Sequence, residues 1–269
     1  MLYEDQAAGF DERAAIPAEA VESMAAAVAE IAELRQGDTL LEIGPGTGML
    51  SLPFLRQPIR YVGFDRSPAM LGVFRERAKE AGLSAELLVA DGNGRWPAED
   101  ESVKAIFSAR ALHHVHVAHA AAETGRVLRS EGGWLILGMV RRPTDSVKPT
   151  FRRQMGKLLE EEGYRGRNHD THTEALFSAL ETAIGGERTE PRVVARWTRR
   201  QAPLDWFKAW QGKEGLAGHD IPEEVKERVL GRLRAWAKAH YGSLEQPLDQ
   251  EQFFELEAIH VRQYEHRIN

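Results

Sequence analysis

Residues 40–48 constrain the fold of this chain more than any other segment. They read Leu-Leu-Glu-Ile-Gly-Pro-Gly-Thr-Gly, an apolar run that contains one acid and continues into three alternate glycines. Such an apolar run suits a central parallel strand that is covered on both faces. Alternate glycines let the backbone turn sharply and approach a ligand closely, where a side chain would block the approach. The segment therefore predicts a buried strand that leads into a nucleotide-binding turn.

The residues after the turn help to separate two classes of cofactor. Residues 49–55, Met-Leu-Ser-Leu-Pro-Phe-Leu, are apolar enough to begin a helix, so we expect a strand, a glycine turn and a helix in succession. A dinucleotide fingerprint G-x-G-x-x-G that starts at Gly44 would need a small residue at position 49, which is Met49. The spacing therefore disfavours a nicotinamide dinucleotide, although an NAD(P)-dependent oxidoreductase stays open as an alternative.

Further stretches follow in an order that fits one parallel sheet. Residues 61–71 form an apolar run that ends in an acid and continues as Arg-Ser-Pro-Ala-Met-Leu, and residues 85–92 form a third run that ends in Asp-Gly. Residues 102–108 predict a fourth strand, and residues 127–137 predict a glycine turn into a fifth. Asp65 ends the second strand, where its carboxylate can accept hydrogen bonds from both hydroxyls of a ribose.

Together these stretches resemble the class I methyltransferases that use S-adenosylmethionine (SAM). The glycine turn matches the E-x-G-x-G-x-G pattern of that family, residues 65–71 match D-x-S-x-x-M-L, and residues 126–133 match its R-V-L-k-p-G-G turn. The resemblance covers roughly residues 38–140 and is greatest to the type 11 group that includes ubiquinone- and biotin-pathway enzymes. It implies an α/β fold with a Rossmann-like seven-stranded sheet, helices on both faces and a helical lid, with SAM as cofactor and S-adenosylhomocysteine (SAH) as product.

The resemblance also implies a set of cofactor-binding residues at the carboxyl ends of the strands. Asp91 would face the exocyclic amine of adenine, and the N–H that follows it would face a ring nitrogen. Glu42 would serve the methionine amino group, orient the turn through its N–H groups, or do both. An N-terminal arm would fold over the cofactor or simply fray. The full expected set is Glu42, Gly44, Gly46, Gly48, Asp65, Arg66, Met70, Asp91, Gly92, Ser108, Phe10 and Arg13.

Four histidines stand close together in residues 110–119, Arg-Ala-Leu-His-His-Val-His-Val-Ala-His. On one helix, His113, His116 and His119 could share a face and approach zinc or nickel. No acid or thiol joins them locally, and the segment resembles the a-L-H-H-v element that many class I methyltransferases carry without metal. We therefore expect no metal, and we expect His113 or His114 to accept a proton from the methyl acceptor or to orient it. Surface exposure and helix packing are the alternative for these histidines.

Periodicity and breakers favour a single methyltransferase domain over residues 1–269. We expect its core to comprise residues 17–140, 190–200 and 251–263, with a helix at 17–34 and a closing antiparallel strand at 252–261. The lid would comprise residues 1–16, 141–186 and 203–249, with helices at 151–159, 174–184, 205–210 and 222–241. A further strand is expected at 192–197.

Composition limits the partners of the protein. A net charge of −6 and a pI near 6.0 argue against a broad nucleic-acid footprint, and the lack of cysteine excludes disulfides and thiolate chemistry. The sequence has no apolar run of membrane-spanning length and begins without signal-peptide character, so we expect a soluble cytoplasmic protein. The function expected is methyl transfer from SAM to a small-molecule acceptor at O, N or C. A non-catalytic SAM- or SAH-binding module is the alternative, and RNA or protein methylation is a variant of the enzyme class.

Overall fold

A computed structural model describes residues 15–164, 170–212 and 214–261 of the chain. Phe10 and Arg13 lie outside these residues. The chain divides into two compact units, here called unit 1 (residues 1–139, 169–195 and 254–269) and unit 2 (residues 140–168 and 196–253). Three of the four boundaries between the units, at residues 139/140, 195/196 and 253/254, fall within strands.

A mixed sheet of eight strands forms the centre of the described chain, with the order β3-β2-β1-β4-β5-β8-β6 and β7 paired to β8 beside this path. Strands β1 to β5 pair in parallel, and β8 runs antiparallel to β6. The strands are β1 (Thr39–Ile43), β2 (Arg60–Asp65), β3 (Glu86–Val89), β4 (Ala105–Ala109), β5 (Trp134–Arg141), β6 (Gly186–Arg188), β7 (Arg192–Gln201) and β8 (Leu248–Val261).

The α/β architecture expected from the sequence is confirmed, but the expected number of seven strands is wrong. The additional strand is β6, whose three residues Gly-Glu-Arg carry no alternation that would predict a strand. It takes the edge position beside β8, and the predicted strand at 192–197 is β7, which pairs with β8 outside the main order. Long-range pairing, rather than local propensity, makes residues 186–188 a strand.

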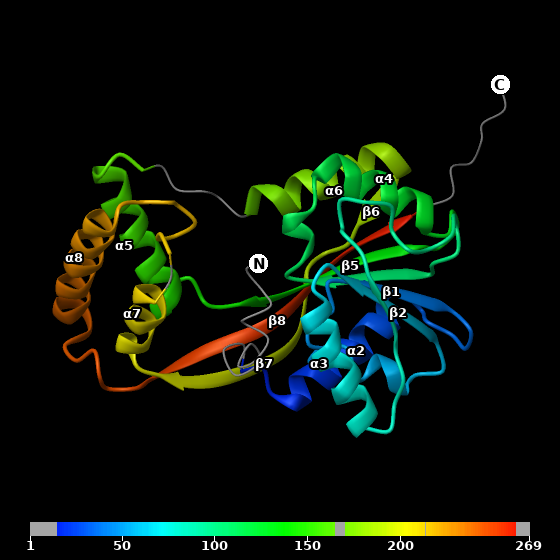
Figure 1. Cartoon of the computed structure of the whole chain (residues 1–269), viewed down its shortest axis with the longest axis horizontal. Helices are drawn as coiled ribbons and strands as arrows, with labels where there is room; N and C mark the ends of the chain where they lie inside the picture. Colours follow the sequence, from blue (N-terminus) through cyan, green and yellow to red (C-terminus); the bar gives the residue numbers. More distant parts are fainter. Residues whose placement is uncertain (1–14, 165–169, 213, 262–269) are drawn as a thin grey trace. The chain divides into compact units, whose positions relative to one another are not determined.

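Helices cover both faces of the sheet in unit 1 (Figure 1). Helices α2 (Ala18–Ile31) and α3 (Pro68–Glu80) lie on one face, and α4 (Val117–Val127) and α6 (Asp170–Ile184) lie on the other. Helix α3 begins where it does because the Ser67 hydroxyl accepts a hydrogen bond from the Met70 N–H at 3.3 Å, and Pro68 occupies the first turn. This start fixes the loop that leads from β2.

The prediction of a helix directly after the glycine turn is wrong. Residues 49–53 form turns instead, followed by a short 3-10 helix (Phe54–Arg56). Pro53 lacks the N–H that a continuous α-helix would use, and hydrogen bonds of the i to i+3 kind run from Ser51 N to Gly48 O and from Phe54 N to Ser51 O. The connection from β1 to β2 is therefore irregular yet buried at Ser51 and Phe54.

Unit 2 has its own apolar core. Helices α5 (Val147–Glu161), α7 (Pro203–Gln211) and α8 (Glu223–Tyr241) pack together around Phe151, which is fully buried among aromatic rings of the other two helices and of the residues at the end of α8. The helix stripes in α5 and α8 that the sequence predicts are thus buried against each other.

The expected lid segment 141–186 is divided between the two units. Residues 140–168 belong to unit 2, whereas α6 belongs to unit 1. Leu176, Phe177 and Leu180 of α6 are fully buried in the core cluster that also contains α4 and the strands. Burial of this apolar face against α4 places α6 with the sheet, so it is a covering helix of unit 1 and not part of a lid.

No helix in the described parts of the chain is long and apolar enough to cross a membrane.

Substitution of Gly48 by alanine is expected to destabilise unit 1 by about 2–4 kcal/mol, as measured by chemical denaturation. Gly48 has a φ of +75°, and a Cβ there would overlap the ring of Phe74 in α3. The expected loss combines left-handed backbone strain with overpacking.

Gly82→Ala is the matched control, because Gly82 has a φ of +70° and, chain neighbours aside, no described residue has an atom within 4 Å of the position that its Cβ would take. It should lose only about 1 kcal/mol, the strain alone. Equal losses in the two variants would show that Phe74 does not pack against the turn.

Candidate cofactor and active site

The carboxyl ends of the five parallel strands β1 to β5 lie at one edge of the sheet in unit 1. Strands β2 and β3 lie on one side of β1, and β4 and β5 lie on the other, so the order of the strands reverses between β1 and β4. Ligands of open parallel sheets bind outside the strand ends at such a reversal. The register places Ile43 beside Phe64 and Asp65 beside Val89, which brings the loops after β1, β2 and β3 together.

The glycine turn after β1 is held by hydrogen bonds to its backbone from both β2 and α3. The Gly44 N–H donates to Phe64 O at 2.9 Å, and the Arg77 guanidinium of α3 donates to Thr47 O at 3.0 Å. A Cβ on Gly44 would overlap Ala111, which follows β4. Gly46 differs, because, apart from its chain neighbours, no described residue has an atom within 4 Å of the position that its Cβ would take. The turn is therefore packed tightly at Gly44 and open at Gly46.

Asp65 joins the two loops that follow β1 and β2. One carboxylate oxygen, Oδ2, accepts a hydrogen bond from the Gly46 N–H at 3.1 Å, and Oδ1 accepts one from the Ser67 N–H at 2.9 Å. A carboxylate can accept about four hydrogen bonds, so two such sites remain. Asp65 thus organises the turn in addition to any contact with a ligand.

Glu42 is buried beneath the turn and does not face outward. Its residue is 2% exposed, and its Oε2 accepts a hydrogen bond from the Tyr61 hydroxyl at 2.7 Å. Burial raises the pKa of Glu42 to about 7, although the hydrogen bond from Tyr61 acts in the opposite direction. The role expected for Glu42, toward the methionine amino group, the N–H groups of the turn or both, stays a prediction.

The loop after β3 begins with Asp91 and is held in place by its own side chains. Asp91 is exposed, and its Oδ1 accepts a hydrogen bond from the Asn93 N–H at 2.9 Å. The Gly92 carbonyl accepts a hydrogen bond from the Trp96 indole at 2.9 Å, and Trp96 is almost completely buried. A Cβ on Gly92 would come within 2.7 Å of Val115, so glycine allows the close approach of the two loops.

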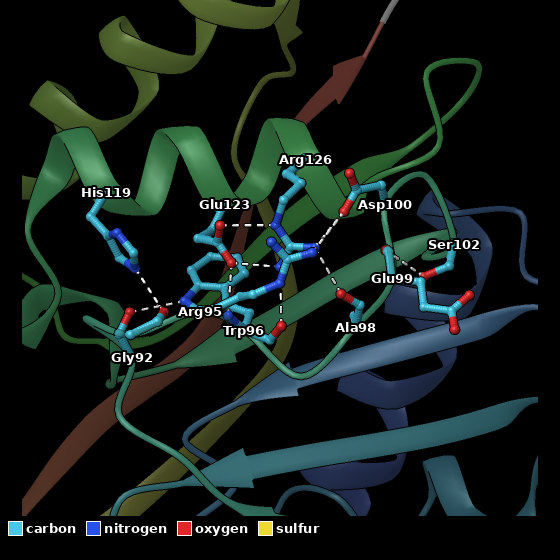
Figure 2. A network of polar contacts seen from close by, with 11 residues as sticks. Gly92, Arg95, Trp96, Ala98, Glu99, Asp100, Ser102, His119, Glu123 and Arg126 are labelled. Carbon is cyan, nitrogen blue, oxygen red and sulfur yellow. Dashed lines mark hydrogen bonds and ion pairs between the residues drawn. The ribbon is translucent and has the colours of Figure 1, made fainter.

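An ion pair on α4 anchors this loop from the other side (Figure 2). Glu123 accepts hydrogen bonds from the Trp96 N–H at 2.7 Å and from the Arg126 guanidinium at 2.6 Å. Arg126 also donates to the carbonyl oxygens of Trp96 and Ala98 at 3.0 and 2.8 Å. The hydrogen bonds from Arg126 lower the pKa of Glu123, so the pair is ionised and its charges are satisfied within the loop.

The remaining predicted cofactor residues have different surroundings. The Ser108 hydroxyl is buried and donates to Ile43 O at 3.0 Å, which ties β4 to the end of β1. Met70 is buried in α3, and Arg66 is exposed in the loop after Asp65. The structure therefore brings the glycine turn, Asp65 and Asp91 to one edge, while Ser108 and Met70 are packed behind it.

The histidine segment lies next to the loop after β3, but its histidines do not share one helix. His113 and His114 belong to a 3-10 helix (Leu112–His114), and α4 begins only after His116. Both rings are exposed and 3.9 Å apart between centroids. Among the described residues no group of three or more histidine, cysteine, aspartate or glutamate side chains could hold a metal ion.

Several residues of this region were not expected from the sequence. The loops of the site are supported, through the contacts given above, by Tyr61, Asn93, Trp96, Glu123 and Arg126. Glu123 and Arg126 stand three residues apart on a helix, a spacing that predicts an ion pair but does not reveal its partner loop. Asn93 and Trp96 carry no local signal for their roles.

Comparisons with known proteins agree with this geometry. Residues 40–132 match the methyltransferase domain family. An uncharacterized methyltransferase of Mycobacterium tuberculosis (strain ATCC 25618 / H37Rv) is 30% identical over 201 residues, which cover 75% of this chain and 74% of the relative. A demethylmenaquinone methyltransferase of Tropheryma whipplei (strain Twist) is 30% identical over 124 residues, which cover 46% of this chain and 50% of the relative.

Solved structures share the fold. A putative methyltransferase from Bacillus halodurans C-125 superposes with a TM-score of 0.57 at 20% identity, covering 88% of this chain and 98% of that one. A geranyl diphosphate methyltransferase in complex with SAM superposes with a TM-score of 0.51 at 15% identity, covering 96% and 90%. The chain belongs to the class I SAM-dependent methyltransferases.

The buried position of Glu42 predicts that Glu42→Gln is more stable than the wild type at pH 8 but not at pH 5. The folded state holds the proton up to a pKa of about 7, against 4.5 for an ordinary glutamate, so the wild type loses stability as pH rises between these values. Glutamine can still accept the Tyr61 hydrogen bond without a charge. The advantage should grow to about 3 kcal/mol at pH 8.

Chemical denaturation of both proteins from pH 5 to pH 8 measures this difference, with Glu80→Gln at an exposed position as control. A stability difference between Glu42→Gln and wild type that stays constant with pH would contradict the raised pKa.

Proposed function

We propose that the protein transfers the methyl group of SAM to a small-molecule acceptor at O, N or C. The observation that carries the proposal is the edge of the sheet in unit 1. There the open side of Gly46, the Asp65 carboxylate and the exposed Asp91 follow three strand ends at the reversal of strand order. This is the set of groups that an adenosine with a charged tail requires.

The residues present fit such a cofactor. Among the described residues, no atom outside the neighbouring residues of the turn lies within 4 Å of a Cβ placed on Gly46, so a ligand can approach the backbone there. Asp65 keeps lone pairs for ribose hydroxyls after binding Gly46 and Ser67, and Asp91 keeps a carboxylate oxygen for the adenine amine. We assign the ribose to Asp65, the adenine to Asp91 and Gly92, and the turn around Gly46 to the methionine part.

Methyl transfer requires little more of this chain than that it position the methyl donor and the acceptor. SAM supplies a methyl group activated by a sulfonium, and the positive charge disperses as the group leaves. The rigid turn and the loop after β3 would hold donor and acceptor in line and keep water out. His113 and His114, exposed beside the loop, are proposed to accept a proton from the acceptor or to orient it, because an imidazole titrates near neutral pH.

We assign acceptor selection to unit 2, whose helices α5, α7 and α8 interrupt the sheet segments of unit 1 in sequence. The name of the demethylmenaquinone methyltransferase relative specifies a small organic acceptor, which supports the same class of acceptor here. The net charge of −6 also disfavours a polyanionic acceptor such as RNA.

Asp65→Ala is expected to weaken SAM and SAH binding by about 2–3 kcal/mol, the scale of lost hydrogen bonds to a charged group. Calorimetric titration of wild type and variant with SAM, SAH and NAD measures this loss. Glu80→Ala, at an exposed carboxylate in the same unit, is the control. Unchanged SAH affinity in Asp65→Ala would refute the ribose assignment, and NAD binding in place of SAH by the wild type would refute the proposed function.

Gly46→Val is expected to abolish SAH binding while the sheet stays folded, because the side chain would fill the open side of the turn. Valine also strains a residue with a φ of +57°, so Gly82→Val, with a φ of +70° in open space, separates strain from obstruction. Circular dichroism should show both variants folded, and only Gly82→Val should bind SAH normally. Normal binding by Gly46→Val would mean that the ligand does not approach this side.

A further inference from the structure

We propose that Asn93 is a positioning residue that couples the adenine end of the cofactor site to the histidine segment. The inference rests on the proposed function, since it takes Asp91 as the adenine-facing acid and His113 and His114 as the residues that face the acceptor. Asn93 itself touches neither ligand in this proposal. It acts through the hydrogen bonds of its backbone and side chain.

The side chain of Asn93 is bound twice to the histidine segment. Its Oδ1 accepts a hydrogen bond from the His116 N–H at 2.8 Å, and its Nδ2 donates to the His114 carbonyl at 3.3 Å. One amide side chain therefore satisfies a donor and an acceptor of the backbone on either side of Val115. This pair of bonds fixes the turn that carries His113 and His114 into α4.

The backbone of Asn93 is bound to the cofactor side. Its N–H donates to Asp91 Oδ1 at 2.9 Å, and the Gly94 N–H donates to the Asp91 carbonyl at 2.9 Å. The carboxylate that is assigned to adenine is thus held by the same residue that holds the histidine segment. Only one residue separates Asp91 from Asn93 in the chain, so a shift of Asp91 must move the Asn93 amide.

The rest of the loop is too firmly held to absorb such a shift (Figure 2). Trp96 is buried and anchored to the Gly92 carbonyl, to Glu123 and to Arg126. His119 of α4 contacts Gly94 O at 2.9 Å through Nε2. Because the loop is held by hydrogen bonds along its length, a displacement of Asp91 moves the Asn93 side chain, and with it the His114 carbonyl and the His116 N–H that it binds.

The consequence is a measurable coupling. Occupation of the adenine site should alter the surroundings of His113 and His114 in the wild type, and this response should require the Asn93 side chain. Removal of that side chain should also loosen Asp91 and raise the Kd for SAH about three- to tenfold, the effect expected for a few lost hydrogen bonds.

The test uses the full chain, Asn93→Ala and Asn93→Asp, with SAH as the probe. Asn93 is exposed, so its truncation leaves the core intact, and thermal unfolding checks this. Arg95→Ala is the matched control, because Arg95 lies in the same exposed loop and pairs with Asp100. Calorimetry gives the Kd, and ¹H–¹³C spectra of the imidazoles, assigned with His113→Gln and His114→Gln, give the histidine response.

In the wild type and Arg95→Ala, saturating SAH is expected to shift the His113 and His114 signals. In Asn93→Ala the shifts should vanish even at saturation, and Asn93→Asp, which keeps the acceptor but loses the donor to His114 O, should be intermediate. Full histidine shifts in saturated Asn93→Ala would overturn the coupling while leaving the proposed function intact. Failure of the wild type to bind SAH would overturn both.

Discussion

The carboxylate of Asp65 is the interaction on which the rest of the site depends. With one oxygen it holds the Gly46 N–H of the turn after β1, and with the other it holds the Ser67 N–H that precedes α3. The strand pairing brings β1 and β2 together, and this carboxylate joins the loops that follow them. The Asp65 carboxylate accepts hydrogen bonds from two backbone N–H groups. The turn is therefore ordered before the hydroxyls of a ligand bind to the same carboxylate. Such preorganisation reduces the cost of binding.

A second constraint acts on the opposite side of the site, where the loop after β3 has no regular structure of its own. Glu123 and Arg126 are both largely buried, with side chains 12% and 15% exposed. A buried ion pair is weak evidence for stability because desolvation offsets much of its attraction. Here Glu123 accepts a hydrogen bond from the loop backbone and Arg126 donates hydrogen bonds to it. The ion pair therefore specifies one conformation of the loop. Trp96 fills the space beneath that loop and closes the apolar core around Phe64.

The sequence predicted the parts of the fold that follow from local pattern. Apolar runs predicted β1 to β5. It failed where distant partners decide. Residues 186–188 become a strand through β8, and the apolar stripe of α6 is buried on α4 in unit 1 although its position in the chain favoured a lid. Residues 49–55 are apolar enough for a helix, but Pro53 lacks the N–H that a continuous helix needs, so the apolar pattern alone predicted the wrong element.

By itself, the sequence determined the glycine turn, the acids at the strand ends and hence the class of cofactor, because backbone freedom and strand period depend on neighbouring residues. The tertiary structure alone decided what those groups contact. Glu42 bonds Tyr61 across 19 positions, Asn93 bonds the His116 N–H across 23, and Trp96 bonds Glu123 across 27. Hydrogen bonds between such distant residues carry no periodic signal, since each needs only one polar atom at the right place once the sheet and helices have packed.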